Sequence, residues 1–115
     1  MSYRYRYAGN FTNISPEPWM GAYHASELPI LMGTHPDFRG PSTQLEYETS
    51  HVMQDAWVAF TIDPTSGMRS QGWKPYANLG EATVREFGAG VAAQDVSVAG
   101  TEAICDGPQP AFSIG

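Results

Sequence analysis

The serines are the first residues of this chain to consider for chemistry, because a serine nucleophile works only beside a base and an acid that orients that base. It usually occupies a sharp Gly-x-Ser-x-Gly turn. None of the serines lies in that motif. Ser42 comes nearest, in the run Gly40-Pro41-Ser42-Thr43-Gln44, but the second glycine is missing and the run is better explained as the entrance to a helix. The residues alone therefore reveal no nucleophile.

The histidines and the carboxylates near them offer metal chemistry. The candidate ligands are His24, Glu27, His35, Asp37 and His51, and their spacing resembles neither a His-Glu-x-x-His helix nor paired Cys-x-x-Cys ligands. We expect no metal site, while binding of a metal or small ligand by His24, Glu27 and His35 stays open as an alternative. A lone histidine is more often a surface residue or a hydrogen-bonded core residue than a ligand, and this is our interpretation of His35 and His51.

Length and charge limit the classes of protein that the chain can represent. With 115 residues, 42% hydrophobic and 16% charged, it has material for one modest core and no second domain. A formal charge of −6 and a pI of about 4.8 argue against a nucleic-acid partner. No apolar run approaches the roughly 18 residues that span a bilayer, so we expect no transmembrane segment. Cys105 is the only cysteine, which excludes an intramolecular disulfide.

The N-terminal half has a clear order of elements. Tyr3–Ala8 alternates tyrosine with arginine, which predicts a strand with its tyrosines on one face. Glycine, asparagine and proline then predict a long irregular loop from Gly9 to about Tyr23, which carries the chain to His24. Two glycosylation sequons lie in this loop, so Asn10 and Asn13 are candidate glycan acceptors.

Two helices are predicted to follow. Ser26 can cap a short helix that has Pro29 in its first turn, ends at Gly33 and turns three side chains to the core, namely Leu28, Leu31 and Met32. The clearest helix is Thr43–Ile62, opened by a capping box of Thr43 and Glu46. Its apolar residues recur at spacings of three and four, and they are Val52, Met53, Ala56, Trp57, Ala59 and Phe60. Its polar residues, Glu46 among them, fall largely on the other side. Pro64 ends it.

The remaining chain is predicted to be mostly loop. The stretch Thr65–Gly80 is expected to be held by Trp73 and Tyr76, and Thr83–Phe87 alternates as a short strand does. Val96 and Val98 fit another edge strand. The last residues, Pro108–Gly115, are expected to be disordered.

One segment has a specific resemblance. Residues Pro18–Gly33 read PWMGAYHASELPILMG, and this run resembles the segment around the catalytic histidine of type-B carboxylesterases, the family of cholinesterases and fungal lipases. The same order of features continues with the helix Met53–Phe60, the pair Asp63-Pro64 and the run Gly72–Tyr76, in which Lys74 departs from the usual pattern. The resemblance covers about Tyr3 to Phe87, and the tandem sequons fit a secreted fungal member.

The resemblance implies an α/β fold, specifically the C-terminal part of an α/β-hydrolase: a late strand, the catalytic-histidine loop, a short helix, a long amphipathic helix and a short terminal strand. It implies a triad in the order serine, acid, histidine, with His24 as the general base. An imidazole suits this task because its ordinary pKa lies close to neutrality. By position in the family, Met20 and Tyr23 are expected to contact substrate, with Trp19 nearby. No cofactor is implied.

The resemblance also implies what this chain lacks. The family's nucleophile, oxyanion glycines and acid lie upstream of anything present, so we expect residues 1–87 to be the C-terminal portion of a carboxylesterase type-B domain and residues 88–115 a poorly ordered tail. A base without its nucleophile gives little rate, so we expect the isolated chain to be inactive.

Three further expectations accompany this interpretation. The substrate of the full-length enzyme is a small-molecule or lipid ester. That protein is secreted, although the start Met1–Ala8 has no signal-peptide pattern. The alternative is a non-catalytic cholinesterase-like interaction module, or a truncated gene product.

Overall fold

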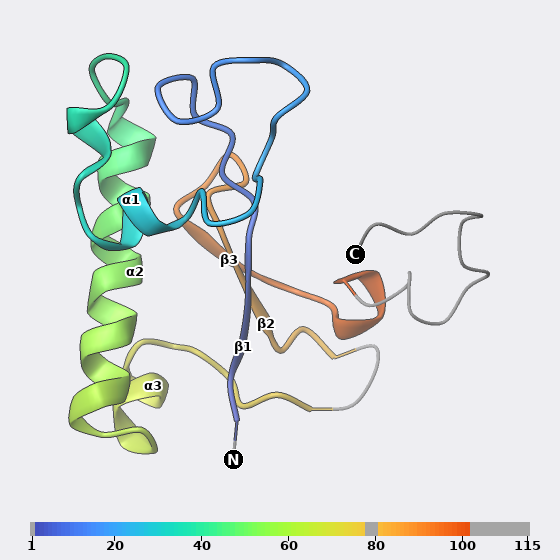
Figure 1. Ribbon diagram of the computed structural model, residues 1–115. Helices are drawn as coiled ribbons and strands as arrows, with labels where there is room; N and C mark the ends of the chain where they lie inside the picture. Colours follow the sequence, from blue (N-terminus) through green and yellow to red (C-terminus); the bar gives the residue numbers. More distant parts are fainter. Residues whose placement is uncertain (1, 78–80, 102–115) are drawn as a thin grey trace.

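The computed structural model describes residues 2–77 and 81–101, and Figure 1 shows their arrangement. The elements, in chain order, are β1 (Arg4–Tyr7), α1 (Leu28–Leu31), a 3-10 turn η1 (His35–Asp37), α2 (Gln44–Ile62), α3 (Ser66–Ser70), β2 (Val84–Phe87) and β3 (Ala93–Val96). Cys105 and the predicted tail Pro108–Gly115 lie outside the described residues. Within the described ranges, no helix combines the length and the apolar character that crossing a bilayer requires.

The three strands form one small mixed sheet with β2 at its centre. β1 runs parallel to β2, with Tyr5 opposite Arg85, and β3 runs antiparallel to β2, with Gln94 opposite Glu86. A parallel pair requires a long crossover connection, and here that crossover contains α1, α2 and α3 (Figure 1). Helices combined with a mixed sheet agree with the predicted α/β class. The assignment to a hydrolase fold remains a prediction.

The two faces of β1 divide as the alternating sequence predicted. The tyrosine face meets α2, where the rings of Tyr5 and Trp57 lie edge to face with centroids 4.9 Å apart. On the other face, Arg6 Nε lies 3.6 Å from Glu86 Oε2. The pattern of period two therefore identified both the strand and its inner face.

The long helix begins and ends where its sequence signals lie. Thr43 Oγ1 accepts a hydrogen bond from the Glu46 N–H, and Glu46 Oε1 accepts one from the Thr43 N–H, which forms a complete capping box. At the other end, Asp63 adopts an extended conformation directly before Pro64. The predicted helix Thr43–Ile62 is confirmed, with Thr43 as its N-cap.

The inward faces of the helices were predicted less well. Glu46 was expected on the polar side of α2 but is 1% exposed, because its carboxylate serves the capping box and lies beside His35. In α1 the buried residue is Ile30, whereas Leu28 and Met32 are exposed. The predicted cap is also wrong: Glu27 is the N-cap of α1, and Ser26 is buried with no hydrogen-bond partner for its hydroxyl among the described atoms.

The stretch after α2 contains a helix that the sequence did not predict. Asp63 Oδ1 accepts hydrogen bonds from the N–H groups of Thr65 and Ser66, and this turn starts α3. A Cβ on Gly67 would overlap the carbonyl of Ala59, so α3 approaches α2 as closely as only glycine allows. Trp73 is buried at 5% exposure, as predicted for an anchor of this stretch.

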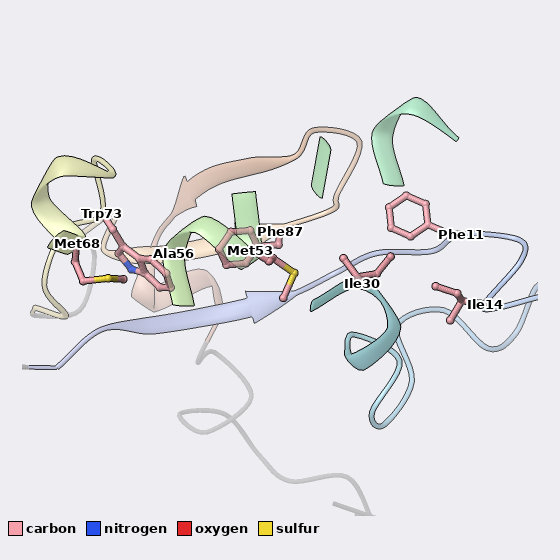
Figure 2. Packing of buried hydrophobic residues seen from close by; sticks show 8 residues of the cluster. All are labelled: Phe11, Ile14, Ile30, Met53, Ala56, Met68, Trp73 and Phe87. Atoms are coloured by element: carbon pink, nitrogen blue, oxygen red, sulfur yellow. The ribbon is translucent and has the colours of Figure 1, made fainter. Parts of the chain in front are cut away.

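The hydrophobic core is a continuous band between α2 and the sheet. Figure 2 shows Met68 and Trp73 at one end, Phe11 and Ile14 at the other, and Met53 with Phe87 between them. Phe11 and Ile14 belong to the long loop after β1. The core therefore reaches into that loop and fixes its first half.

The segment after β2 is structured as far as it is described. β3 pairs with β2, and Val98 is fully buried. The expected poorly ordered tail from residue 88 is therefore wrong for residues 88–101, because β3 lies within them. The predicted edge strand at Val96 and Val98 is shifted: the observed strand ends at Val96, and Val98 lies in a short helical segment.

Candidate active site

The loop from residue 8 to residue 27 connects the end of β1 to α1 and carries His24. The Ala8 N–H bonds to the Phe87 carbonyl at 2.9 Å, which extends the β1–β2 pairing by one residue into this loop. The loop thus starts at the carboxyl end of a strand in a parallel pair, the edge of an α/β sheet where ligand sites gather. Figure 1 shows it rising from β1 on the side away from α3.

Two hydrogen bonds tie the second half of this loop to its first half. The Tyr23 hydroxyl donates to the Ile14 carbonyl at 3.0 Å, and the Ser15 hydroxyl donates to the Gly21 carbonyl at 2.6 Å. Gly21 has a φ of +54°, a conformation that glycine adopts at no steric cost. Because Ile14 is fully buried, these bonds hold the residues next to His24 against the core.

His24 lies at the outer turn of the loop, exposed to solvent. Its imidazole makes no hydrogen bond or ion pair with the residues that the structure describes. The turn is closed by the Ser26 N–H, which bonds to the Tyr23 carbonyl at 3.0 Å. Ala25 has a φ of +67°, which is uncommon for a residue with a Cβ and costs about 1 kcal/mol. The backbone beside His24 is therefore strained, a feature that recurs at functional sites.

The predicted substrate contacts share this loop with His24. Trp19 is 81% exposed, Met20 is half-buried and Tyr23 is 38% exposed. Tyr23 also has a structural role, because its hydroxyl donates a hydrogen bond to the Ile14 carbonyl. What it can offer a ligand is its ring.

Glu27, three residues after His24, lies near the tyrosine face of β1. Burial raises the pKa of Tyr5, and the negative charge of Glu27 raises it further. Burial also raises the pKa of Tyr7 strongly, with smaller contributions from Glu46, Glu27 and Tyr23. Both hydroxyls therefore remain protonated at neutral pH, and the negative charges of Glu46 and Glu27 both act on Tyr7.

A second group of polar residues, which the sequence did not reveal, is buried where the loop meets the start of α2. His35 Nδ1 lies 2.5 Å from Ser42 Oγ and 3.8 Å from Glu46 Oε2. Asn13 Nδ2 donates to Ser42 Oγ and to the His35 carbonyl, each at 3.1 Å. We call Asn13, His35, Ser42 and Glu46 the buried polar cluster. His35, Glu46 and Asn13 are each less than 5% exposed.

The buried polar cluster contains a serine, a histidine and an acid, but not in the arrangement of a catalytic triad. A triad places the serine at one imidazole nitrogen and the acid at the other. Here Ser42 and Glu46 both face Nδ1 of His35. The interpretation of His35 as a hydrogen-bonded core residue is therefore confirmed, and the cluster acts as a structural link.

The structure also bears on the alternative that His24, Glu27 and His35 together bind a metal or a small ligand. His35 is buried among Ser42, Glu46 and Asn13, whereas His24 is exposed on the outer turn of the loop. In the part of the chain that the structure describes, no three histidine, cysteine or carboxylate side chains converge as metal ligands do.

The two candidate glycan acceptors, Asn10 and Asn13, differ in their exposure to solvent. Asn10 is exposed, whereas Asn13 is 4% exposed with its amide nitrogen engaged in the cluster. A glycan would need that nitrogen, so the folded arrangement is incompatible with one on Asn13. Among the residues of the buried polar cluster, only Glu46 had a structural signal in the sequence, namely its capping box with Thr43. Asn13 was interpreted solely as part of a sequon.

An apolar cavity of about 210 Å³ lies away from His24. Its walls come from the start of β1, the second half of α2, α3 and the chain after it, and the residues are Tyr3, Tyr5, Ala56, Trp57, Phe60, Met68 and Trp73. Tyr3 directly precedes β1, and the opposite end of this strand leads to the His24 loop. The cavity is therefore not part of the candidate site.

Two curated relatives are similar to this chain. A chlorogenic acid esterase of Aspergillus niger is 64% identical over 66 residues, which cover 57% of this chain and 13% of that protein. Secreted lipase 5 of Gibberella zeae is 53% identical over 72 residues, which cover 63% of this chain and 13% of that protein. The resemblance to fungal esterases and lipases is thereby confirmed, and the matched part is a small fraction of each relative. No protein-family profile matches the chain, and no solved structure matches it.

Proposed function

We propose that this chain is part of a carboxylic-ester hydrolase and that His24 is the general base of its active site. An esterase and a lipase are its relatives, at 64% and 53% identity. The observation that carries the assignment of His24 is its placement: an exposed imidazole, without a partner among the described residues, on the loop at the carboxyl end of β1. Such a group is free to accept a proton from a reacting hydroxyl.

In the proposed reaction His24 moves one proton in each direction. It takes the proton of a serine hydroxyl as that oxygen attacks the ester carbonyl carbon, and it then gives the proton to the oxygen of the leaving alcohol. In the second half it takes a proton from water, which attacks the acyl-serine, and returns that proton to the serine. The serine and the acid that orients His24 come from another part of the longer protein.

The neighbours of His24 are proposed to contact the substrate. The Tyr23 hydroxyl is bound to Ile14, so Tyr23 contributes its ring and Met20 its flexible thioether chain. Trp19 offers a large exposed ring on the same loop. An aromatic or aliphatic part of an ester fits these surfaces better than a charged one does.

The test uses the Aspergillus niger chlorogenic acid esterase with its matching segment replaced by this chain. His24→Gln in this graft is expected to lower kcat for a short aryl ester by about 100- to 10,000-fold, with a small change in KM, because a general base acts in the transition state. The matched control is His51→Gln, since His51 is an exposed histidine on α2.

Three results would contradict the proposal. These are an equal loss of activity in both variants, a full activity of the His24→Gln graft, and ester hydrolysis by this chain alone that survives His24→Gln. The last would show that the catalytic groups lie elsewhere in these 115 residues.

A further inference from the structure

Two glycosylation sequons lie three residues apart in the loop after β1, and they differ in how far the fold buries them. The first is Asn10-Phe11-Thr12 and the second is Asn13-Ile14-Ser15. Both asparagine and threonine of the first are exposed, whereas all three residues of the second are buried. A glycan is bulky and hydrophilic, so it is compatible only with an acceptor on the surface.

The Asn13 side chain is a structural part of the fold. Its Nδ2 has two hydrogens, and both are directed into the protein, toward Ser42 Oγ and the His35 carbonyl at 3.1 Å and the Gly40 carbonyl at 3.4 Å. N-linked glycosylation replaces one of these hydrogens by a sugar. A glycan on Asn13 would thus displace the loop from His35 and Ser42 and open the buried polar cluster.

The other two residues of the second sequon are also buried and make structural contacts. Ile14 is 1% exposed and belongs to the core. Ser15 is 4% exposed, and its hydroxyl donates to the Gly21 carbonyl at 2.6 Å. This sequon therefore has a purely structural explanation.

The first sequon has no such explanation. The Asn10 side-chain amide makes no hydrogen bond with the described residues, and Thr12 is exposed beside it. Phe11 between them is 6% exposed and anchors the turn in the core, which directs its two neighbours outward. Nothing in the described fold would have to move to accommodate a sugar on Asn10.

We propose that Asn10 carries an N-linked glycan and that Asn13 remains unmodified as a structural residue. The transfer uses a lipid-linked oligosaccharide as donor. A bond forms between Asn10 Nδ2 and the anomeric carbon of the sugar, the bond from that carbon to the pyrophosphate oxygen breaks, Nδ2 loses one proton, and the lipid pyrophosphate leaves. This proposal rests on entry of the protein into the secretory pathway, and not on ester hydrolysis by His24.

The experiment is secretion of the full chain from a yeast behind a heterologous leader. Peptide N-glycosidase F in ¹⁸O water converts a glycosylated asparagine to labelled aspartate, which peptide mass spectrometry locates. We expect label at position 10, none at position 13, and loss of all label in Thr12→Ala. The matched variant Ser15→Ala removes only the second sequon, so it should retain the label at position 10.

If the yeast does not secrete the chain, the same chain is translated in the presence of microsomal membranes. We then expect its band on a gel to shift by the mass of one glycan. Thr12→Ala should abolish that shift and Ser15→Ala should retain it. Label at position 13 in the folded secreted chain, an unmodified Asn10, or a shift that survives Thr12→Ala would overturn the proposal. Activity of the graft is a separate measurement, so a failure of this proposal is distinguishable from a failure of the proposed function.

Discussion

The Tyr23 hydroxyl donates a hydrogen bond of 3.0 Å to the carbonyl of Ile14 and so joins the residue before His24 to the buried part of the same loop. Ile14 is 1% exposed and packs in the core with Phe11. The outer turn that presents His24 is thereby fixed to the core by a side chain instead of by regular secondary structure. The position of His24 depends on this bond and on the Ser15 to Gly21 bond beside it.

Tyr23→Phe is expected to remove the bond and keep the ring. The free energy of unfolding should fall by about 0.5 to 1.5 kcal/mol, the usual net contribution of one hydrogen bond, measured by urea denaturation. Tyr47→Phe is the control, because Tyr47 is an exposed tyrosine whose hydroxyl makes no hydrogen bond with the described residues. Equal effects of the two changes would show that the Tyr23 bond does not stabilise the loop.

The second prediction compares the effect on stability of truncating a buried and an exposed methionine. Met53 is fully buried between α2 and the sheet, whereas Met32 is 67% exposed after α1. Met53→Ala should lower the free energy of unfolding by about 2 to 5 kcal/mol through lost burial and a cavity, and Met32→Ala by less than about 0.5 kcal/mol. Thermal unfolding followed by near-UV circular dichroism checks both. A larger effect at Met32 would contradict the described orientation of α1.

The capping box of α2 predicts a smaller effect at its first residue. Thr43→Ala removes the acceptor for the Glu46 N–H and should lower the free energy of unfolding by about 1 kcal/mol. Thr61→Ala is the control on the same helix, because the exposed Thr61 hydroxyl only bonds back to the Trp57 carbonyl and alanine is a better helix former. If Thr61→Ala proves the more damaging change, the N-terminal cap is not what stabilises α2.

The buried polar cluster predicts a loss of stability in mild acid. Burial lowers the pKa of His35, His51 lowers it further, and the carboxylates of Glu46 and Asp37 oppose the shift without reversing it. The unfolded chain therefore binds a proton at this histidine more readily than the folded chain does. The contribution of His35 is fully present above its ordinary pKa of 6.5 and is lost as the pH falls below that value.

The measurement is the urea midpoint between about pH 7.5 and pH 5, the range in which His35 titrates when unfolded. The midpoint should fall with pH in the original chain and in His51→Gln, and it should fall less in His35→Gln. Asp63 does not interfere, because hydrogen bonds from Ser66 and Thr65 lower its pKa and its contribution is lost only below its ordinary value of 3.8. A midpoint that is constant over this range in the original chain would refute the assignment.

The sequence predicted those elements whose signals are local. Alternating tyrosine and arginine identified β1 and its inner face, and Thr43, Glu46 and Pro64 located both ends of α2. Such signals act through neighbours in the chain, so no knowledge of the fold is needed to interpret them. The glycine at position 33, with a φ of +72°, likewise follows α1 as predicted.

The features that the sequence did not predict depend on contacts between distant residues. Glu46 is polar, yet it is buried because His35, eleven residues earlier, lies against it. Asn13 was interpreted as a glycan acceptor because its contacts with Ser42 become visible only in the fold. The candidate site is similar in this respect: the placement of His24 was inferred from the resemblance, whereas the bond from Tyr23 to Ile14 that supports it was not foreseen.

The central claim, that His24 acts as the general base, is tested most directly by chemical rescue. In the graft within the Aspergillus niger esterase, His24→Gly should abolish turnover of an aryl ester, and added imidazole should restore a part of it that rises with the concentration of neutral imidazole. His51→Gly should keep its activity and gain nothing from imidazole. A folded His24→Gly graft that imidazole does not rescue, or that keeps full activity without it, would contradict the account.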